Sequence, residues 1–189
     1  GFQHEITKEE FRRRIEDNRL LDVVRRVPVK KGDVFFIPAG TLHAIGKGIL
    51  ICEIQQNSNT TYRVYDYGRI GTDGRPRDLH IEKALEVTHL APVTQHAASA
   101  PPIDIIAGAE VRLLAACDFF TVYHLAVKGA CTLYAGTDSF QCLTVLDGSL
   151  TLHSNREELC VQKGASVFLP AGLGHYELRG DGALILSKI

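Results

Sequence analysis

Three side chains suited to chemistry stand in the first third of the chain, each in a different setting. His43 ends the run KGDVFFIPAGTLH, Glu53 stands in the apolar run ILICEI, and Arg63 stands among the aromatic residues of YRVYDY. A histidine ligates metals or transfers protons, a carboxylate acts as a general base, and the planar donors of an arginine bind oxyanions. The elements around each side chain decide whether it serves such a role.

The setting of His43 predicts a strand, a tight corner and a second strand. Residues 34–37 are β-branched or aromatic, which is typical of a buried strand. Pro38 cannot donate to a sheet ladder, and Gly40 permits the positive φ of a sharp corner. His43 then opens the next strand, a rigid support that suits a metal ligand or an acid–base group.

Glu53 and Arg63 each allow two interpretations from the residues alone. A carboxylate buried in an apolar strand is costly unless it is paired, so Glu53 is either functional or on the solvent side of a half-exposed strand. Residues 62–67 alternate as a strand does, and Arg63 sits between aromatic side chains. A structural cation–π contact therefore competes with anion binding as the role of Arg63.

The motif around His43 occurs twice. The run VKKGDVFFIPAGTLH aligns without gaps with VQKGASVFLPAGLGH, which ends at His175, 132 positions later. Internal repeats of this kind indicate repeated structural units. The shared spacing, G-x5-P-x-G-x2-H, resembles the second signature motif of the cupin β-barrels, whose histidine is a metal ligand. The sequence therefore predicts a mainly β protein with two cupin-type jelly-roll barrels and a few short helices.

Helices are predicted near the start of the chain and before its middle. Thr7 and Glu10 fit a capping box, and Asp78 is the expected cap of a helix that continues to Val87. Residues 95–104, with a Pro-Pro pair, form the predicted linker between a first domain of residues 1–94 and a second of residues 105–189. The second domain shows short strands, among them a hairpin predicted at Asp147-Gly148.

Neither predicted barrel contains a full set of metal ligands. Upstream of His175, Gln141 occupies the position where cupins have a glutamate, and no histidine accompanies it. His175 is therefore expected to be a structural remnant. Only 42 residues precede His43, and they look helical, so the first barrel is predicted to be incomplete. The chain lacks methionine, which supports the expectation that its N-terminal part is missing and that Gly1 is an internal position.

Composition excludes several classes of function. The net charge of −1 lacks the basic excess of proteins that bind nucleic acid or anionic membranes. No apolar run reaches the roughly 18–20 residues of a membrane span. The five cysteines are odd in number and form no CxxC pair, which is typical of reduced thiols in a cytoplasmic protein. Nothing in the sequence predicts an oligomeric state.

Residues 7–90 resemble type I phosphomannose isomerase in its short bacterial form. The resemblance rests on KKGDVFFIPAGTLHAIGKG, ILICEIQQNSNTTYRVYDYGR and DLHIEKALEV, and the second barrel matches the family's C-terminal cupin in size. It implies that His43 is one zinc ligand and that the others, a Gln-x-His pair and a glutamate, lie upstream of Gly1. It also implies that Arg63 is the active-site arginine and Glu53 an active-site glutamate.

The resemblance implies interconversion of mannose 6-phosphate and fructose 6-phosphate, a small-molecule reaction that proceeds through an enediol. In that reading zinc polarises substrate oxygens, Glu53 transfers the proton, and Arg63 binds either the enediolate or the phosphate. A non-catalytic sugar-binding or regulatory cupin module is the alternative, with His43 merely packed in the barrel. A metal-dependent dioxygenase or epimerase is a third possibility, but the NSNTTYR run and the absence of a 2-His-1-carboxylate set argue against it.

Overall fold

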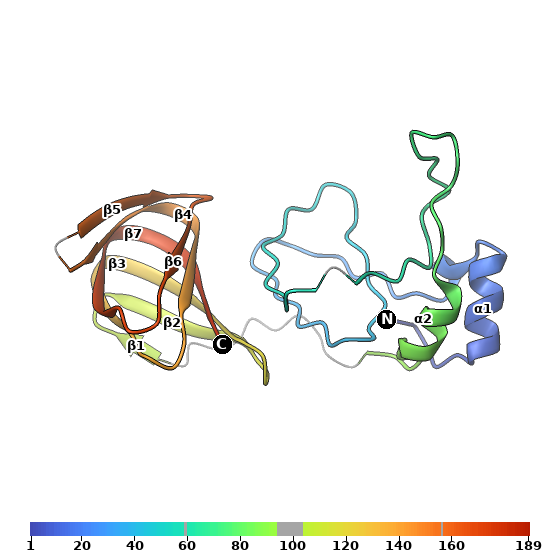
Figure 1. Ribbon diagram of the computed structural model, residues 1–189, viewed down its shortest axis with the longest axis horizontal. Coiled ribbons are helices and arrows are strands. Elements are labelled where there is room, and N and C mark those ends of the chain that lie inside the picture. Colours follow the sequence, from blue (N-terminus) through green and yellow to red (C-terminus); the bar gives the residue numbers. More distant parts are fainter. Residues whose placement is uncertain (59, 94–103, 156) are drawn as a thin grey trace. The chain divides into compact units, whose positions relative to one another are not determined.

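The computed structural model describes residues 1–58, 60–93, 104–155 and 157–189. The chain divides into two compact units, Gly1–Cys52 with Asn57–Ala97 and Glu53–Gln56 with Ala98–Ile189 (Figure 1). Apart from Asp104, the predicted linker lies outside the described residues. No helix in the described ranges has the length and apolar character needed to cross a bilayer.

Helices surround the core of the first unit. They are α1 (Lys8–Glu16), the 3-10 helix η1 (Leu20–Asp22) and α2 (Ile81–Val87). The cap of α1 is confirmed, because the Thr7 hydroxyl accepts a hydrogen bond from the Glu10 amide at 3.1 Å. The nine buried apolar residues of this core come from the three helices, from the segments between them and from the residues before α1: Phe2, Ile6, Phe11, Ile15, Leu20, Val23, Val64, Ala84 and Leu85.

The N-cap of helix α2 lies two residues later than predicted. The N-cap position belongs to His80, not to Asp78, and the His80 side chain makes no capping bond. Its Ala84 and Leu85 are buried in the core of the first unit. On the exposed side, a two-pronged ion pair between Arg12 and Glu82 joins α1 to α2. The position of α2 is therefore set by packing and by its pairing with α1.

The strands predicted in the first unit are not formed. Residues 34–37, 49–54 and 62–67 contain no strand, and residues 1–58 and 60–93 show only two isolated bridges. Several of their apolar side chains are exposed, among them Phe35, Ile37 and Leu50, the last by 97%. A strand exists only when a neighbouring strand takes up its backbone donors and acceptors. The side-chain pattern suits a sheet, but no partner strand lies alongside it among the described residues.

The second unit carries every strand of the described chain. A single antiparallel sheet has the order β1-β2-β3-β7-β4-β5, with β6 paired to β4. The sheet curls over its own core (Figure 1). The strands are β1 (Asp104–Ile106), β2 (Ala109–Ala116), β3 (Thr121–Ala135), β4 (Gln141–Ser154), β5 (Glu157–Gln162), β6 (Ser166–Leu169) and β7 (Gly174–Lys188). The prediction of a mainly β protein is confirmed. The prediction of two barrels, the first of them incomplete, is not confirmed.

Side chains alternate across this curved sheet. In β7, Tyr176 and Leu178 are buried, while His175 and Arg179 are exposed, as the two-residue period of a strand requires. Strand β7 pairs with β3 along fifteen consecutive residues and with β4 on its other side. The resulting core is apolar throughout apart from a few hydroxyl, thiol and amide groups.

The hairpin predicted at Asp147-Gly148 is wrong. Strand β4 continues through these residues, and its register against β7 shifts by one residue between Val145 and Asp147. Gly148 has φ +76°, and a Cβ on it would lie 2.3 Å from the Asp181 carbonyl oxygen of β7. The Asp-Gly pair therefore serves a β-bulge, where glycine permits the positive φ and the close approach of the neighbouring backbone.

Candidate functional site

The turn that carries His43 is fastened to the chain directly after α2. The amide of His89 donates a hydrogen bond to the Gly40 carbonyl at 2.9 Å. Gly40 has φ +84°, and a Cβ there would approach the Val87 carbonyl oxygen to 2.5 Å. Only glycine fits this position without displacing its neighbours. The tight corner predicted from the sequence is present, although its flanking strands are not.

The imidazole of His43 is exposed and oriented by its own turn. Its Nδ1 lies 2.8 Å from the Thr41 carbonyl oxygen. A carbonyl only accepts, so Nδ1 carries a proton, and in the neutral ring the lone pair lies on Nε2. Metal-ligating histidines are commonly oriented in this way.

A zinc site needs more donors than the described residues bring together. No group of three or more His, Cys, Asp or Glu residues in residues 1–58, 60–93, 104–155 and 157–189 is placed to hold a metal ion. Tetrahedral zinc sites require three or four protein ligands. The orientation of His43 fits one ligand, but the described part of the chain does not form a complete zinc site.

Arg63 is half-buried and held by three hydrogen bonds to the segment before α2. Its amide donates to Nδ1 of His80 at 2.9 Å, and the His80 amide donates to the Arg63 carbonyl at 2.7 Å. Its guanidinium reaches the Asp78 carbonyl oxygen at 3.4 Å. Val64, the next residue, is buried in the core. Both the backbone and the side chain of Arg63 are therefore positioned.

Arg63 stands at the base of an irregular hairpin formed by residues 62–80, which we call the 62–80 hairpin. Further along it, Arg77 pairs with Asp66 through both carboxylate oxygens, and a single antiparallel bridge joins Ile70 to Pro76. The 62–80 hairpin extends away from α2 in Figure 1. Because its ladder is nearly absent, these side-chain bonds carry much of its alignment.

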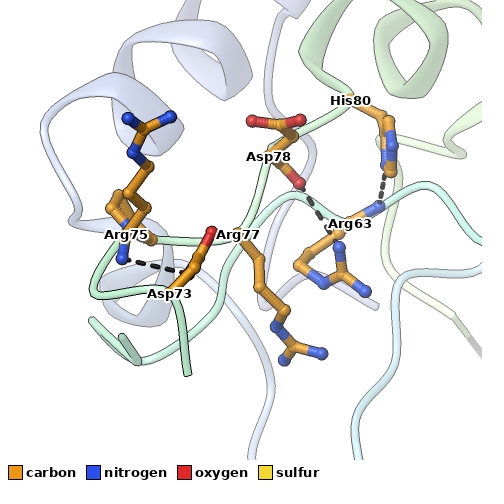
Figure 2. A pocket seen from close by; sticks show the side chains of 7 residues that line it. Arg63, Asp73, Arg75, Arg77, Asp78 and His80 are labelled. Carbon is orange, nitrogen blue, oxygen red and sulfur yellow. Dashed lines mark hydrogen bonds between the residues drawn. The ribbon is translucent and has the colours of Figure 1, made fainter. Parts of the chain in front are cut away.

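A pocket of about 450 Å³ lies along the 62–80 hairpin. Figure 2 shows the guanidinium groups of Arg63 and Arg77 on one side of the hairpin and that of Arg75 on the other. The three cations do not converge on one point. The pocket is lined by Arg63, Asp73, Arg75, Pro76, Arg77, Asp78 and His80.

The charges along the 62–80 hairpin are not equally available to a ligand. Hydrogen bonding and attraction from Arg77 lower the pKa of the Asp66 carboxyl, and the same contact raises the pKa of Arg77. Both groups of this pair therefore stay charged, and their opposite charges compensate each other. The ring contacts proposed as one role for Arg63 are made by other cations, Arg69 over Tyr67 and Lys83 over Tyr62. The Arg63 guanidinium remains at the pocket wall.

Glu53 groups with a different unit from His43 and Arg63. Its side chain is exposed, and residues 53–56 group with the second unit, whereas His43 and Arg63 belong to the first. His43 and Arg63, in contrast, share one support, because His80 precedes α2 and His89 follows it. Sequence reasoning missed both of these histidines. The one local signal for His80 is its position directly before a helical pattern, and nothing local reveals that Arg63 lies beside it.

In the interior of the second unit, Gln141, at the position where cupins have a glutamate, is hydrogen-bonded to Tyr176. The Tyr176 hydroxyl donates to Gln141 Oε1 at 2.6 Å, and Gln141 Nε2 donates to the Tyr134 carbonyl at 2.9 Å. Burial raises the pKa of Tyr176, so the phenol stays neutral. His175 lies on the outer face, its ring 4.9 Å from that of Tyr134.

The outer face beside His175 is hollowed by a second pocket of about 450 Å³. His153, Glu158 and Glu177 share it with His175, and His153 Nε2 lies 3.4 Å from a carboxylate oxygen of Glu158. His175 thus points away from the core, not into it.

Comparison with known proteins identifies relatives for nearly the whole chain. Residues 110–189 match the family model described as mannose-6-phosphate isomerase, cupin domain. The chain is 38% identical over 184 residues to the probable mannose-6-phosphate isomerase GmuF of Bacillus subtilis, covering 97% of this chain and 58% of that protein. It is also 36% identical over 187 residues to the mannose-6-phosphate isomerase of Streptococcus mutans, covering 98% of this chain and 58% of that protein.

A solved structure of a protein named for the same activity is also similar to this chain. The crystal structure of mannose 6-phosphate isomerase from Bacillus subtilis has a TM-score of 0.85 and 33% identity, covering 98% of this chain and 58% of that one. The chain thus spans somewhat more than half the length of the relatives it matches. The resemblance found in the sequence is confirmed: nearly the whole chain is similar to mannose-6-phosphate isomerases, and residues 110–189 match the model of their cupin domain.

Proposed function

We propose that this chain is part of an aldose–ketose isomerase that interconverts mannose 6-phosphate and fructose 6-phosphate. The observation that carries the proposal is the similarity of 97% of the chain to proteins named for that activity. The constrained, half-buried Arg63 is the local feature that agrees with it. The partner is accordingly a small sugar phosphate.

The reaction moves a proton from C2 of the aldose to C1 through an enediol. It needs a base near these carbons and a donor for the negative charge that develops on oxygen. Arg63 is the proposed donor, either to that oxyanion or to the phosphate, because its planar guanidinium forms paired hydrogen bonds with oxyanions. Glu53 is the proposed base, an assignment that rests on the family resemblance.

Zinc is the proposed cofactor, and it supplies polarisation of the substrate oxygens when bound. His43 is the ligand that this chain contributes, through the lone pair on Nε2. The described residues do not complete a zinc site, and we propose from the family resemblance that the other ligands lie upstream of Gly1.

Missing upstream strands would also account for the exposed apolar side chains of the first unit. Phe35, Ile37 and Ile51 are between 42% and 49% exposed, as expected of barrel strands that lack their neighbours. We therefore propose that residues 1–94 are the C-terminal part of a catalytic cupin domain, residues 95–104 a linker, and residues 105–189 a second, degenerate cupin. The proposed compartment is the cytoplasm, where thiols such as the buried Cys131 stay reduced.

The decisive experiment reads the source gene upstream of the codon for Gly1 and expresses the complete reading frame. We expect a Gln-x-His pair and a glutamate in the added residues, bound zinc, and isomerisation of mannose 6-phosphate in a coupled assay. The variant His43→Ala should lose zinc, measured by mass spectrometry of the metal content.

Two results would overturn the proposal. One is a start codon directly before Gly1, together with a purified protein that neither binds zinc nor turns over sugar phosphate; the non-catalytic module would then be favoured. The other is an active enzyme in which His43→Ala keeps full zinc occupancy, which would reject the ligand assignment.

A further inference from the structure

The backbone of Arg63 is bonded to a side chain where a strand would have a backbone partner. In a regular antiparallel pair, an amide and a carbonyl of one residue bond the carbonyl and amide of the residue opposite. Here the Arg63 carbonyl accepts from the His80 amide at 2.7 Å, but the Arg63 amide donates to the imidazole Nδ1 of the same residue at 2.9 Å. Both dashed contacts of Arg63 in Figure 2 end on residues directly before α2.

The geometry defines the state of the His80 ring. An amide only donates, so Nδ1 must present its lone pair and the ring proton must sit on Nε2. At His43, in contrast, Nδ1 faces a carbonyl and must carry a proton. The His80 imidazole thus acts as an acceptor of defined position.

The support of His80 is rigid. Its carbonyl accepts the first helical bond of α2, from the Ala84 amide at 3.0 Å, and Ala84 is buried in the core of the first unit. Through the Arg12–Glu82 ion pair, α2 is also joined to α1. Hydrogen bonding to His80 therefore transmits the fixed position of a packed helix to Arg63.

We propose that His80 is a positioning residue for Arg63, holding its guanidinium at the wall of the pocket through the hydrogen bond from the Arg63 amide to His80 Nδ1. The proposal rests on the proposed role of Arg63 toward a sugar-phosphate oxyanion. Neither the family resemblance nor the sequence patterns assign a role to His80. Loss of this bond leaves the base of the 62–80 hairpin with one hydrogen bond fewer and lets the guanidinium move more widely, which weakens stabilisation of a developing charge.

Three variants of His80 separate positioning from bulk packing. In His80→Asn the amide oxygen takes the place of Nδ1 and restores the acceptor. In His80→Gln the same group lies one carbon further out and cannot take that place. In His80→Leu no acceptor remains. The Asn and Gln variants form a matched pair of equal chemistry, which keeps the test valid even where the Leu variant does not fold.

The first measurement uses the chain of residues 1–189 and needs no activity. Nitrogen-15 NMR is expected to show an unprotonated Nδ1 on His80 and slow hydrogen exchange of the Arg63 amide. Exchange should stay slow in His80→Asn and become at least about tenfold faster in His80→Gln. Equal exchange rates in these two variants, or a protonated Nδ1 in the parent chain, would overturn the proposal.

The second measurement is kinetic and uses the complete reading frame. His80→Gln should lower kcat/KM about ten- to hundredfold, mainly through kcat, while His80→Asn stays close to the parent. Combined with Arg63→Ala, His80→Gln should cause no further loss, because both changes act on one group.

The outcomes distinguish this inference from the proposed function. Fully additive losses, or no loss in His80→Gln while Arg63→Ala is strongly impaired, overturn the positioning role alone. An unimpaired Arg63→Ala enzyme overturns the proposed role of Arg63, and the positioning role with it.

Discussion

At the scale of single residues, the hydrogen bonds to His80 distinguish Arg63 from Arg69 in the same segment. Arg63 has its backbone bonded on both sides to His80, whereas Arg69 is exposed and rests over the ring of Tyr67, 5.4 Å from the ring centroid. An arginine that must meet a charge appearing only during reaction gains from being held in place beforehand. An exposed cation–π contact needs no such constraint.

Arg63→Ala in the complete reading frame should lower kcat/KM by about a hundredfold or more, because a preorganised donor to an oxyanion is lost. Steady-state kinetics with mannose 6-phosphate measures the effect, and circular dichroism checks the fold. Arg69→Ala is the matched control, since it removes the same group from the same segment outside the pocket. Equal kinetics for the two variants would contradict the assignment.

Tyr176 illustrates a different constraint, in the core of the second unit. Tyr176→Phe removes the hydroxyl that bonds Gln141 Oε1 at 2.6 Å and leaves a buried acceptor without its partner. The free energy of unfolding should fall by about 1–3 kcal/mol, measured by urea denaturation. Tyr134→Phe, at a position 58% exposed, should change it by less than about 0.5 kcal/mol. An unchanged Tyr176→Phe variant would show that the hydrogen bond contributes little.

At the scale of elements, α2 is the support common to the two sequence motifs. His80, before its first residue, bonds Arg63, and His89, two residues after its end, bonds Gly40 in the His43 turn. A seven-residue helix contributes little stability of its own. Because α2 is packed on the core, it can fix the positions of two loops, the one with Arg63 and the one with Gly40.

Gly40→Ala tests this support. The substitution combines a positive φ with a Cβ 2.5 Å from the Val87 carbonyl oxygen, so the His43 turn must move away from α2. Gly48→Ala is the control, because Gly48 has φ +78° and no atom within 4 Å of an added Cβ. We expect Gly40→Ala to lower the free energy of unfolding by at least about 1 kcal/mol more than Gly48→Ala, measured by thermal or urea unfolding. Equal losses would mean that the contact with α2 is unimportant.

At the scale of the whole molecule, the two units differ in how complete their cores are. In the second unit β1–β7 pair only with one another among the described residues, and fifteen buried residues form its core. The first unit has nine buried core residues and carries extended apolar segments that face outward. Burial of apolar surface is the main stabilising contribution to folding, so the second unit is the better candidate for independent folding.

Residues 104–189 expressed alone should fold cooperatively, with a dispersed NMR spectrum matching the corresponding signals of the full chain. Residues 1–93 alone should unfold with a broad transition and bind a hydrophobic dye, because their apolar segments are exposed. Urea titrations followed by fluorescence and NMR measure both. A fragment 104–189 that remains unfolded would show that its core depends on the rest of the chain.

Several features could be predicted from the sequence because they depend on near neighbours. The Thr7 cap and the corner at Gly40 both follow from side chains a few residues apart. The repeated motif indicated cupin barrels, and the runs around His43, Glu53 and Arg63 together led to the mannose-6-phosphate isomerases. The motif's histidines nevertheless have different surroundings: His43 is oriented by its own turn, and His175 lies on an outer face.

Other features were decided only by tertiary structure, because they depend on which segment lies alongside. Asp147-Gly148 has the local pattern of a hairpin, yet the passing backbone of β7 makes it a bulge. Residues 34–37 have the pattern of a strand, yet no neighbouring strand is present in the described residues to pair with them. Arg63 and His80 are 17 positions apart, and only the return of the chain makes one the partner of the other. Sequence patterns define what a segment can do, and its neighbours in space define what it does.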